Sequence, residues 1–187
     1  MNADHVEAMR ETAKHIGRVQ CFMAEAMGNL MQRAIDHDKS KWGPEEWPYF
    51  AEATKNLRGI TYGSEEYKAA LRQIKPAIDH HQQSNSHHPE FYRALECNGC
   101  FKMFPANYDK SCDVCGYGQF TPRDSDITGM SLLDLLEMLA DWRAATERHA
   151  DGCILKSLEI NAKRFIIPEP LRRILTNTVQ ELGWDRP

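Results

Sequence analysis

The stretch HHQQSNSHHPE, from position 80 to position 90, places four of the chain's eight histidines within nine residues. Neutral imidazole is the commonest protein ligand for first-row transition metals. Four groups that titrate near neutrality add little to a surface helix, so the cluster predicts a metal site. The alternative is a polar loop that is merely rich in histidine. The candidate ligands are His80, His81, His87 and His88.

Four of the six cysteines form two C-x-x-C pairs with the spacing C-x2-C-x11-C-x2-C. Two such turns present four thiolates tetrahedrally, which suits Zn²⁺ and leaves no coordination position open, so the predicted zinc is structural. A rubredoxin-like iron is the alternative. The element would serve as a metal-stapled loop or lid, which we favour, or as a module that binds nucleic acid or a protein partner. The ligands are Cys97, Cys100, Cys112 and Cys115.

Two further segments supply donors. His37 and Asp38 offer one nitrogen and one oxygen to the same ion, and Lys41 follows one turn later, where it would neutralise a bound phosphate. A late leucine-rich helix carries acidic side chains at spacings of three and four, which place them on one face. Carboxylates in so apolar a helix need a cation or a hydrogen-bond network, although an exposed acidic stripe would give the same pattern. The charged residues of this face are Asp134, Glu137, Asp141 and Arg148.

The elements that position these donors are predicted to be helices. Apolar residues recur at steps of three and four over residues 6–35, which indicates a long amphipathic helix. Gly28-Asn29 interrupts the pattern, and because glycine followed by asparagine is a turn and C-cap signal, we expect a hairpin there. A hairpin would bring His15 towards His37, whereas a continuous helix would hold the two about 33 Å apart.

Shorter helices are expected in the rest of the chain, with N-caps at Ser64 and Ser131 and a kink at Pro76. No strand pattern of useful length occurs outside the cysteine region. The sequence therefore predicts an all-α bundle with a small inserted four-cysteine zinc ribbon. The helical domain comprises residues 1–94 and 125–187, and the ribbon comprises residues 95–124. The shorter helices are expected near residues 44–57, 64–81, 131–150, 153–165 and 170–182.

Composition places further bounds on the protein. Of the 187 residues, 42% are hydrophobic and 27% charged, which is typical of one soluble globular domain. No apolar run is long enough to span a membrane, and the first residues lack the apolar core of a signal peptide, so we expect a cytoplasmic protein. The net charge of −4, with both signs interspersed, gives no global case for a nucleic-acid or membrane partner. Cys21 and Cys153 stand alone in apolar helical segments and are expected to be buried thiols.

As a set, these motifs resemble the HD superfamily of metal-dependent phosphohydrolases. HDKSK resembles its HD-x-x-K signature, the pair at His80 and His81 its later histidines, and ADWRAAT the segment with its last aspartate ligand, here Asp141. HIGRV, which begins at His15, resembles its first-histidine motif, although the spacing to HDKSK is shorter than usual. HDKSK, HHQQSNSHHPE and LLDLLEMLADWRAAT together resemble more closely an uncharacterised family common in phage and bacterial genomes, over most of the chain.

The HD resemblance implies a helical fold and the hydrolysis of a nucleotide or another small phosphate ester by metal-activated water. One or two divalent ions are expected, drawn from Fe, Mn, Co, Mg and Zn, and Asp38 could bridge two of them. Lys41, with Arg143 or Arg148, would neutralise phosphate charge. Glu90, Asp134 and Glu137 are candidates for orienting histidines or relaying a proton. The candidate ligands are His15, His37, Asp38, His80, His81, His87, His88 and Asp141.

Two other functions are compatible with the sequence. A histidine-rich di-iron site on an HD-like scaffold is similar to sites that activate O₂, which gives an oxygenase as the rival enzyme. A non-catalytic zinc protein would instead bind nucleic acid or a host protein through the ribbon and need only one zinc. Aromatic residues at positions 42, 47, 49 and 50 could form an exposed patch for a homodimer. If the chain is phage-encoded, its location would be the host cytoplasm.

Overall fold

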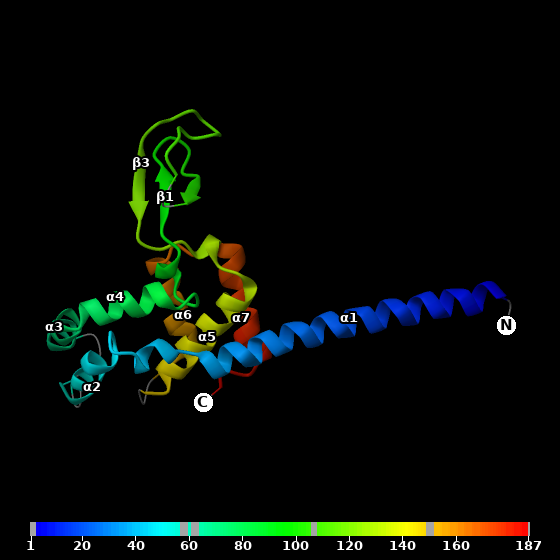
Figure 1. Cartoon of the computed structure of the whole chain (residues 1–187), viewed down its shortest axis with the longest axis horizontal. Coiled ribbons are helices and arrows are strands. Elements are labelled where there is room, and N and C mark those ends of the chain that lie inside the picture. The colour runs from blue at the N-terminus through cyan, green and yellow to red at the C-terminus, as the bar shows by residue number, and fades with distance from the viewer. Residues whose placement is uncertain (1–2, 57–59, 61–63, 106–107, 149–151, 187) are drawn as a thin grey trace. The chain divides into compact units, whose positions relative to one another are not determined.

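The structure is a computed structural model that divides into two compact units, Met1–His37 and Asp38–Pro187. Seven α-helices and one three-stranded sheet lie within the part of the chain that the structure describes (Figure 1). The predicted fold class, mainly helical with a small element that carries four clustered cysteines, is confirmed. The described residues are 3–56, 60, 64–105, 108–148 and 152–186.

Helix α1 (Ala3–Asp36) runs without interruption through Gly28 and Asn29 (Figure 1). The predicted hairpin is therefore wrong. A single glycine costs a helix only about 1 kcal/mol relative to alanine, and the residues around it are mostly good helix formers. The Asn29 side chain donates a hydrogen bond of 2.9 Å to the Glu25 carbonyl oxygen, so it stays within the helical pattern. His15 consequently lies about 30 Å from the end of α1.

No side chain of α1 is buried among the residues described. Cys21 is exposed on this helix, and Cys153 is half-buried at the N-cap of α6 (Ile154–Arg164). The expectation that both thiols are buried is therefore wrong, because an apolar helical segment does not by itself show what covers it. None of the described helices, including the 34 residues of α1, is long and apolar enough to cross a membrane.

The histidine-rich region is reached through a series of short helices. The predicted single helix with a kink is instead two helices, because the chain leaves helical geometry at Ile74 and Pro76 has no N–H with which to continue the ladder. Ser64 caps the first of the two by accepting a hydrogen bond of 3.1 Å from the Tyr67 N–H, as predicted. These elements are η1 (Lys39–Trp42), α2 (Trp47–Asn56), α3 (Glu65–Gln73) and α4 (Lys75–Ser84).

The sheet follows α4 and the short turn η2 (Pro89–Phe91). Its central strand, β1 (Ala94–Cys97), pairs antiparallel with β2 (Met103–Pro105) on one side and β3 (Phe120–Arg123) on the other. Among the described residues, its small core has only three that are buried, Cys97, Phe104 and Cys112, with a few partly buried side chains packed against them, and the rings of Phe104 and Tyr108 lie 4.3 Å apart. A core this small does not stabilise a fold by itself, and a metal ion bound by the four cysteines would supply the missing stabilisation.

The main hydrophobic core lies where η3 (Ile127–Gly129), α5 (Leu132–Thr146), α6 and α7 (Glu169–Glu181) meet. Helix α5 begins with a capping box, in which Ser131 and Asp134 each bond the other's backbone N–H. The fully buried members of the core include Met138, Leu139, Ile154, Leu158 and Val179. The acidic residues of α5 lie on a neighbouring face of the helix, and this face contributes to the site described next.

Candidate metal sites

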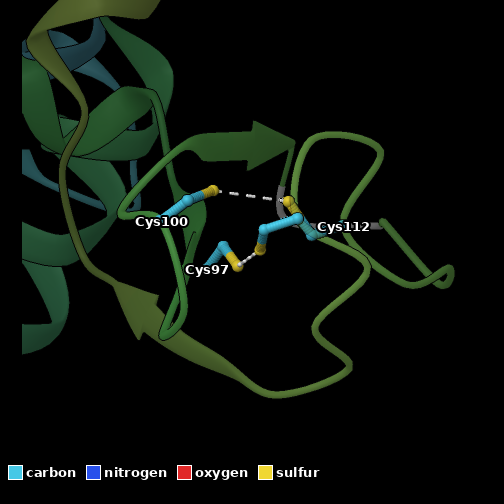
Figure 2. Close-up of side chains that lie close together, drawn as sticks. Cys97, Cys100 and Cys112 are labelled. Carbon is cyan, nitrogen blue, oxygen red and sulfur yellow. Dashed lines mark hydrogen bonds between the residues drawn. The ribbon is translucent and has the colours of Figure 1, made fainter.

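The four predicted cysteines lie together at one end of the sheet. Their Sγ atoms are all within 4.8 Å of one another, with 3.6 Å between Cys97 and Cys115 and 3.5 Å between Cys100 and Cys112 (Figure 2). Zn–S bonds of about 2.3 Å in a tetrahedron separate neighbouring sulfurs by about 3.8 Å. The four-cysteine cluster is therefore suited to Zn²⁺.

The backbone of the two knuckles favours thiolates in this geometry. A Cβ on Gly99 would lie 3.1 Å from the Cys115 sulfur, and Gly116 has a left-handed φ of +72° that other residues rarely adopt. Burial raises the pKa of the Cys112 thiol, but hydrogen bonds from the Cys115 and Val114 N–H groups outweigh it and lower the pKa to about 6. The backbone N–H groups around Cys112 therefore favour its thiolate, which is the form that binds metal.

A second cluster brings together one carboxylate and three imidazoles. One ligand atom from each of its four residues lies within 4.8 Å of the others. Asp38 Oδ1 is 3.2 Å from His81 Nε2 and 3.4 Å from His87 Nε2. His88 Nε2 is 3.0 Å from His81 Nε2. Three ring nitrogens and a carboxylate oxygen that converge on one point form a donor set that could hold a transition-metal ion.

Glu46 orients His81 within this cluster. The Glu46 side chain has no exposed surface, and its two oxygens lie 2.8 Å from His80 Nδ1 and 2.9 Å from His81 Nδ1. A carboxylate accepts hydrogen bonds, so we infer that Nδ1 carries the proton in His81 and that Nε2 presents its lone pair to the cluster. A carboxylate behind a histidine in this manner is the usual support of a metal ligand.

Glu137 plays the same part for His87. His87 is buried, and its Nδ1 lies 3.1 Å from Glu137 Oε1, while its Nε2 faces Asp38. Burial lowers the pKa of His88 to about 3, with further lowering from His87 and His81. An imidazole that stays neutral at ordinary pH keeps a lone pair available for a metal.

Asp38 stands at the centre of the cluster. It has a left-handed backbone (φ 55°, ψ 21°), which aspartate tolerates better than most residues. Burial opposes ionisation of its side chain, but His81, His87 and Lys41 together hold the pKa of Asp38 well below its usual range. Lys41 forms an ion pair with Oδ2, the oxygen that does not face the imidazoles. Asp141 also has a carboxylate oxygen within 4.8 Å of one of Asp38.

Asp134 attaches the turn that carries His87 and His88 to α5. Its two oxygens accept hydrogen bonds of 2.6 Å from Ser86 Oγ and 2.9 Å from the Tyr92 hydroxyl, on either side of the histidines. Burial would raise the pKa of Asp134, but bonds from Ser131, Ser86 and Tyr92 outweigh it and hold the pKa below its usual range. Asp134 thus remains ionised and positions the turn that carries His87 and His88.

Other predicted site residues lie outside the four-donor group. His80 bonds Glu46 and has a side chain that is 42% exposed. Glu90 accepts hydrogen bonds from Gln82 and Arg164 and lines a separate polar cavity. The remaining cases are His15, exposed on α1; His37, the last residue of the first unit; Arg143, bonded to Thr146 and Glu147; and Arg148, exposed after α5.

Three residues of the site were not predicted from the sequence. Glu46 gave no signal because it lies in a Pro-Glu-Glu-Trp turn where an exposed acid is expected. Asn85 donates to Ser40 Oγ at 2.8 Å and to the His81 carbonyl at 2.7 Å, which ties the end of α4 to η1. Only the polar character of the SNS segment and of HDKSK could have indicated Asn85 and Ser40.

These features define a mainly helical protein with a four-cysteine site suited to zinc and a His/Asp cluster that could bind a second metal ion. Comparison with family profiles matches residues 4–182 to a family of unknown function, DUF5662, and the chain belongs to this family. No curated protein and no solved structure matches the chain. The match to the family identifies no activity, so the chemistry must be argued from the site.

Proposed function

We propose that the protein is a metal-dependent phosphohydrolase that acts on a nucleotide or another small phosphate ester. The observation that carries the proposal is the convergence of Asp38 Oδ1 with the Nε2 atoms of His81, His87 and His88. Two of these imidazoles are backed by the carboxylates of Glu46 and Glu137. The HD-like motif HDKSK supplies the reaction class.

A divalent ion held by these donors would lower the pKa of a bound water and polarise a phosphoryl oxygen. The residues of the chain would orient the histidine ligands and neutralise the charge of the phosphate. Glu46 and Glu137 keep the Nε2 atoms of two histidines directed at the site. Lys41, already paired with Asp38, places a cation where a phosphate oxygen would need one. Asp141, close to Asp38, is the candidate ligand for a second ion.

His37 is proposed as an additional donor because it precedes Asp38 directly, so the two α-carbons are about 3.8 Å apart. Arg143 is proposed as a second cation for phosphate, at the end of α5 that carries Asp141. Arg148 is exposed, so we assign it a smaller part than Arg143 in neutralising the charge of the phosphate. These assignments rest on the proposed function.

The excess of imidazole over carboxylate in the cluster favours one alternative, a di-iron oxygenase. The two enzymes differ in what they consume. A phosphohydrolase releases phosphate under anaerobic conditions with Mn²⁺, Co²⁺ or Mg²⁺, whereas an oxygenase needs Fe²⁺ and takes up O₂.

The test compares His87→Ala with His80→Ala. His87 belongs to the four-donor group and His80 does not, so the pair controls for removing one imidazole from the same segment. Each protein is analysed for metal content, then loaded with individual divalent ions and offered nucleoside mono-, di- and triphosphates and p-nitrophenyl phosphate. We expect phosphate release by wild type and His80→Ala, and loss of the second ion and of release in His87→Ala. Zinc in the ribbon alone after metal add-back, or a loaded protein that releases no phosphate, would refute the proposal.

A further inference from the structure

Apolar side chains are exposed along the whole of α1. Met9 and Met23 each expose 61% of their surface and Ile16 exposes 51%, and none of the described residues of this helix is buried. A helix in water owes most of its stability to the packing of its apolar face, and within the described residues of the unit Met1–His37 no other element packs on the apolar side chains of α1.

The spacing of these residues indicates what covers them. Positions at alternating steps of three and four run over four heptads from Val6 to Ala34, which is a period of 3.5 residues, and all of them are apolar except Gln20. This period keeps an apolar seam facing a second helix that supercoils around the first, and a helix packed on a globular body does not require it. The seam comprises Val6, Met9, Ala13, Ile16, Gln20, Met23, Met27, Leu30 and Ala34.

The charges of α1 fit the same arrangement. Its acidic and basic residues lie mostly on the outer positions of the heptad, where Glu7, Glu11, Lys14 and Arg18 form local pairs or face solvent. The helix contains five acidic and four basic residues, so it lacks the excess of positive charge with which amphipathic helices bind anionic membranes.

We propose that α1 pairs with α1 of a second copy of this chain as a parallel two-stranded coiled coil. Gln20 is the polar residue at a central a position, and in a parallel pair it meets its own equivalent, so that the two amides can bond each other and fix the register. A strip about 10 Å wide along a helix about 51 Å long covers on the order of 500 Å² per copy. The total of roughly 1,000 Å² reaches the size of a specific interface.

The molar mass of the full-length protein in solution tests the pairing. We expect a dimer by light scattering and sedimentation, and a monomer for Ile16→Glu, which places a charge in the seam. The matched control is Cys21→Glu, which adds the same charge to an exposed position outside the seam. Far-UV circular dichroism distinguishes loss of pairing from a change in the C-terminal unit, because only the helicity attributable to α1 should fall. The proposal would be overturned if the wild-type protein were still a monomer after its concentration is raised 100-fold, or if Ile16→Glu left the dimer intact.

The direction of the pair is tested by a cross-link. Val6→Cys, made in a Cys21→Ser background, places two thiols side by side in a parallel pair and more than 30 Å apart in an antiparallel one. We expect a disulfide-linked dimer under mild oxidation, with the link between the two residues at position 6 identified by mass spectrometry. A non-cross-linking dimer would refute the parallel arrangement. A monomer that instead binds lipid vesicles or another protein would exclude the second copy as the partner.

Discussion

The carboxylate of Glu46 is predicted to set the metal affinity of the His/Asp cluster, although it is not itself among the four donors. Glu46 is fully buried and accepts from Nδ1 of both His80 and His81. Glu46→Gln keeps the size of the side chain but replaces one acceptor oxygen with an NH₂ group. That group faces an imidazole that can no longer donate to it, so one histidine must change its tautomer or lose its bond.

The expected loss of metal affinity follows from what is typical for carboxylates that bond a metal-binding histidine. Removing the carboxylate behind a metal-ligating histidine typically weakens metal binding about 10- to 100-fold, or roughly 1.4–2.8 kcal/mol. We expect a Kd for Mn²⁺ or Zn²⁺ that is raised by this factor, measured by competition with a fluorescent chelator while the ribbon keeps its zinc. The stabilisation that a fixed, saturating metal concentration confers against heat should fall by the same amount.

The neighbouring acid provides the control. Glu45 is adjacent in the sequence but exposed, so Glu45→Gln removes the same charge without touching either histidine and should leave the Kd unchanged. Equal affinities for the Glu46→Gln and Glu45→Gln variants would show that His81 does not depend on Glu46 for its orientation. The assignment of His81 Nε2 as a ligand would then lose its support.

Three further predictions concern the elements that hold the sites. Asp134→Asn should lower the free energy of unfolding by about 1–3 kcal/mol, because one of the hydrogen bonds that Asp134 accepts is lost. Since the pKa of Asp134 is depressed in the folded state, its contribution is complete above pH about 5 and is lost progressively as the pH falls towards the folded-state pKa, so chemical denaturation from pH 6 to 3 should show the difference between wild type and Asp134→Asn narrowing without vanishing. Cys112→Ser should remove the zinc and the order of the ribbon while the His/Asp cluster still binds its ion, as elemental analysis and chelator titration would show; joint loss of both metals would contradict their independence. Gly28→Ala should stabilise α1 by about 1 kcal/mol in thermal melts followed by circular dichroism, and a destabilised helix would indicate a turn at this position.

Local patterns predicted most of the helices and the cysteine cluster. Ser64 and Ser131 cap helices where their sequences predict caps, because capping depends on residues within one turn. The cysteine spacing likewise predicts the cluster, since each C-x-x-C turn closes within a few residues. Gly28 and Asn29 show the limit of such signals. A Gly-Asn dipeptide often ends a helix, but α1 continues through it because long runs of helix-forming residues lie on both sides.

The His/Asp cluster could be predicted only in part, because its geometry depends on contacts between segments. The sequence indicated four clustered histidines but not which of them converge. His80 and His81 are adjacent on a helix and so point about 100° apart, and only one of them can face Asp38. The buried position of Glu46 decides how both are held. It depends on the contacts of Glu46 with two histidines of α4 that lie 34 and 35 residues further along the chain, and the sequence gives no signal for it.

The two candidate metal sites differ in what holds their donors in place, and this difference argues for different roles. In the ribbon, four sulfurs surround one point and close it, so an ion there would support the fold of a sheet that has almost no core of its own. Asp38 is the N-cap of η1, His81 lies in α4 and His87 lies in the turn that follows. Lys41, Glu46 and Glu137 hold these three side chains, and Asp134 holds the turn through Ser86. A cluster whose donors are arranged by the protein's own bonds does not need an ion to fold. Removal of the second metal by a mild chelator should therefore leave the helical unit folded, with its far-UV circular dichroism unchanged, whereas removal of zinc should unfold the ribbon; collapse of the helical unit on loss of the second ion would mean that the His/Asp site is structural as well.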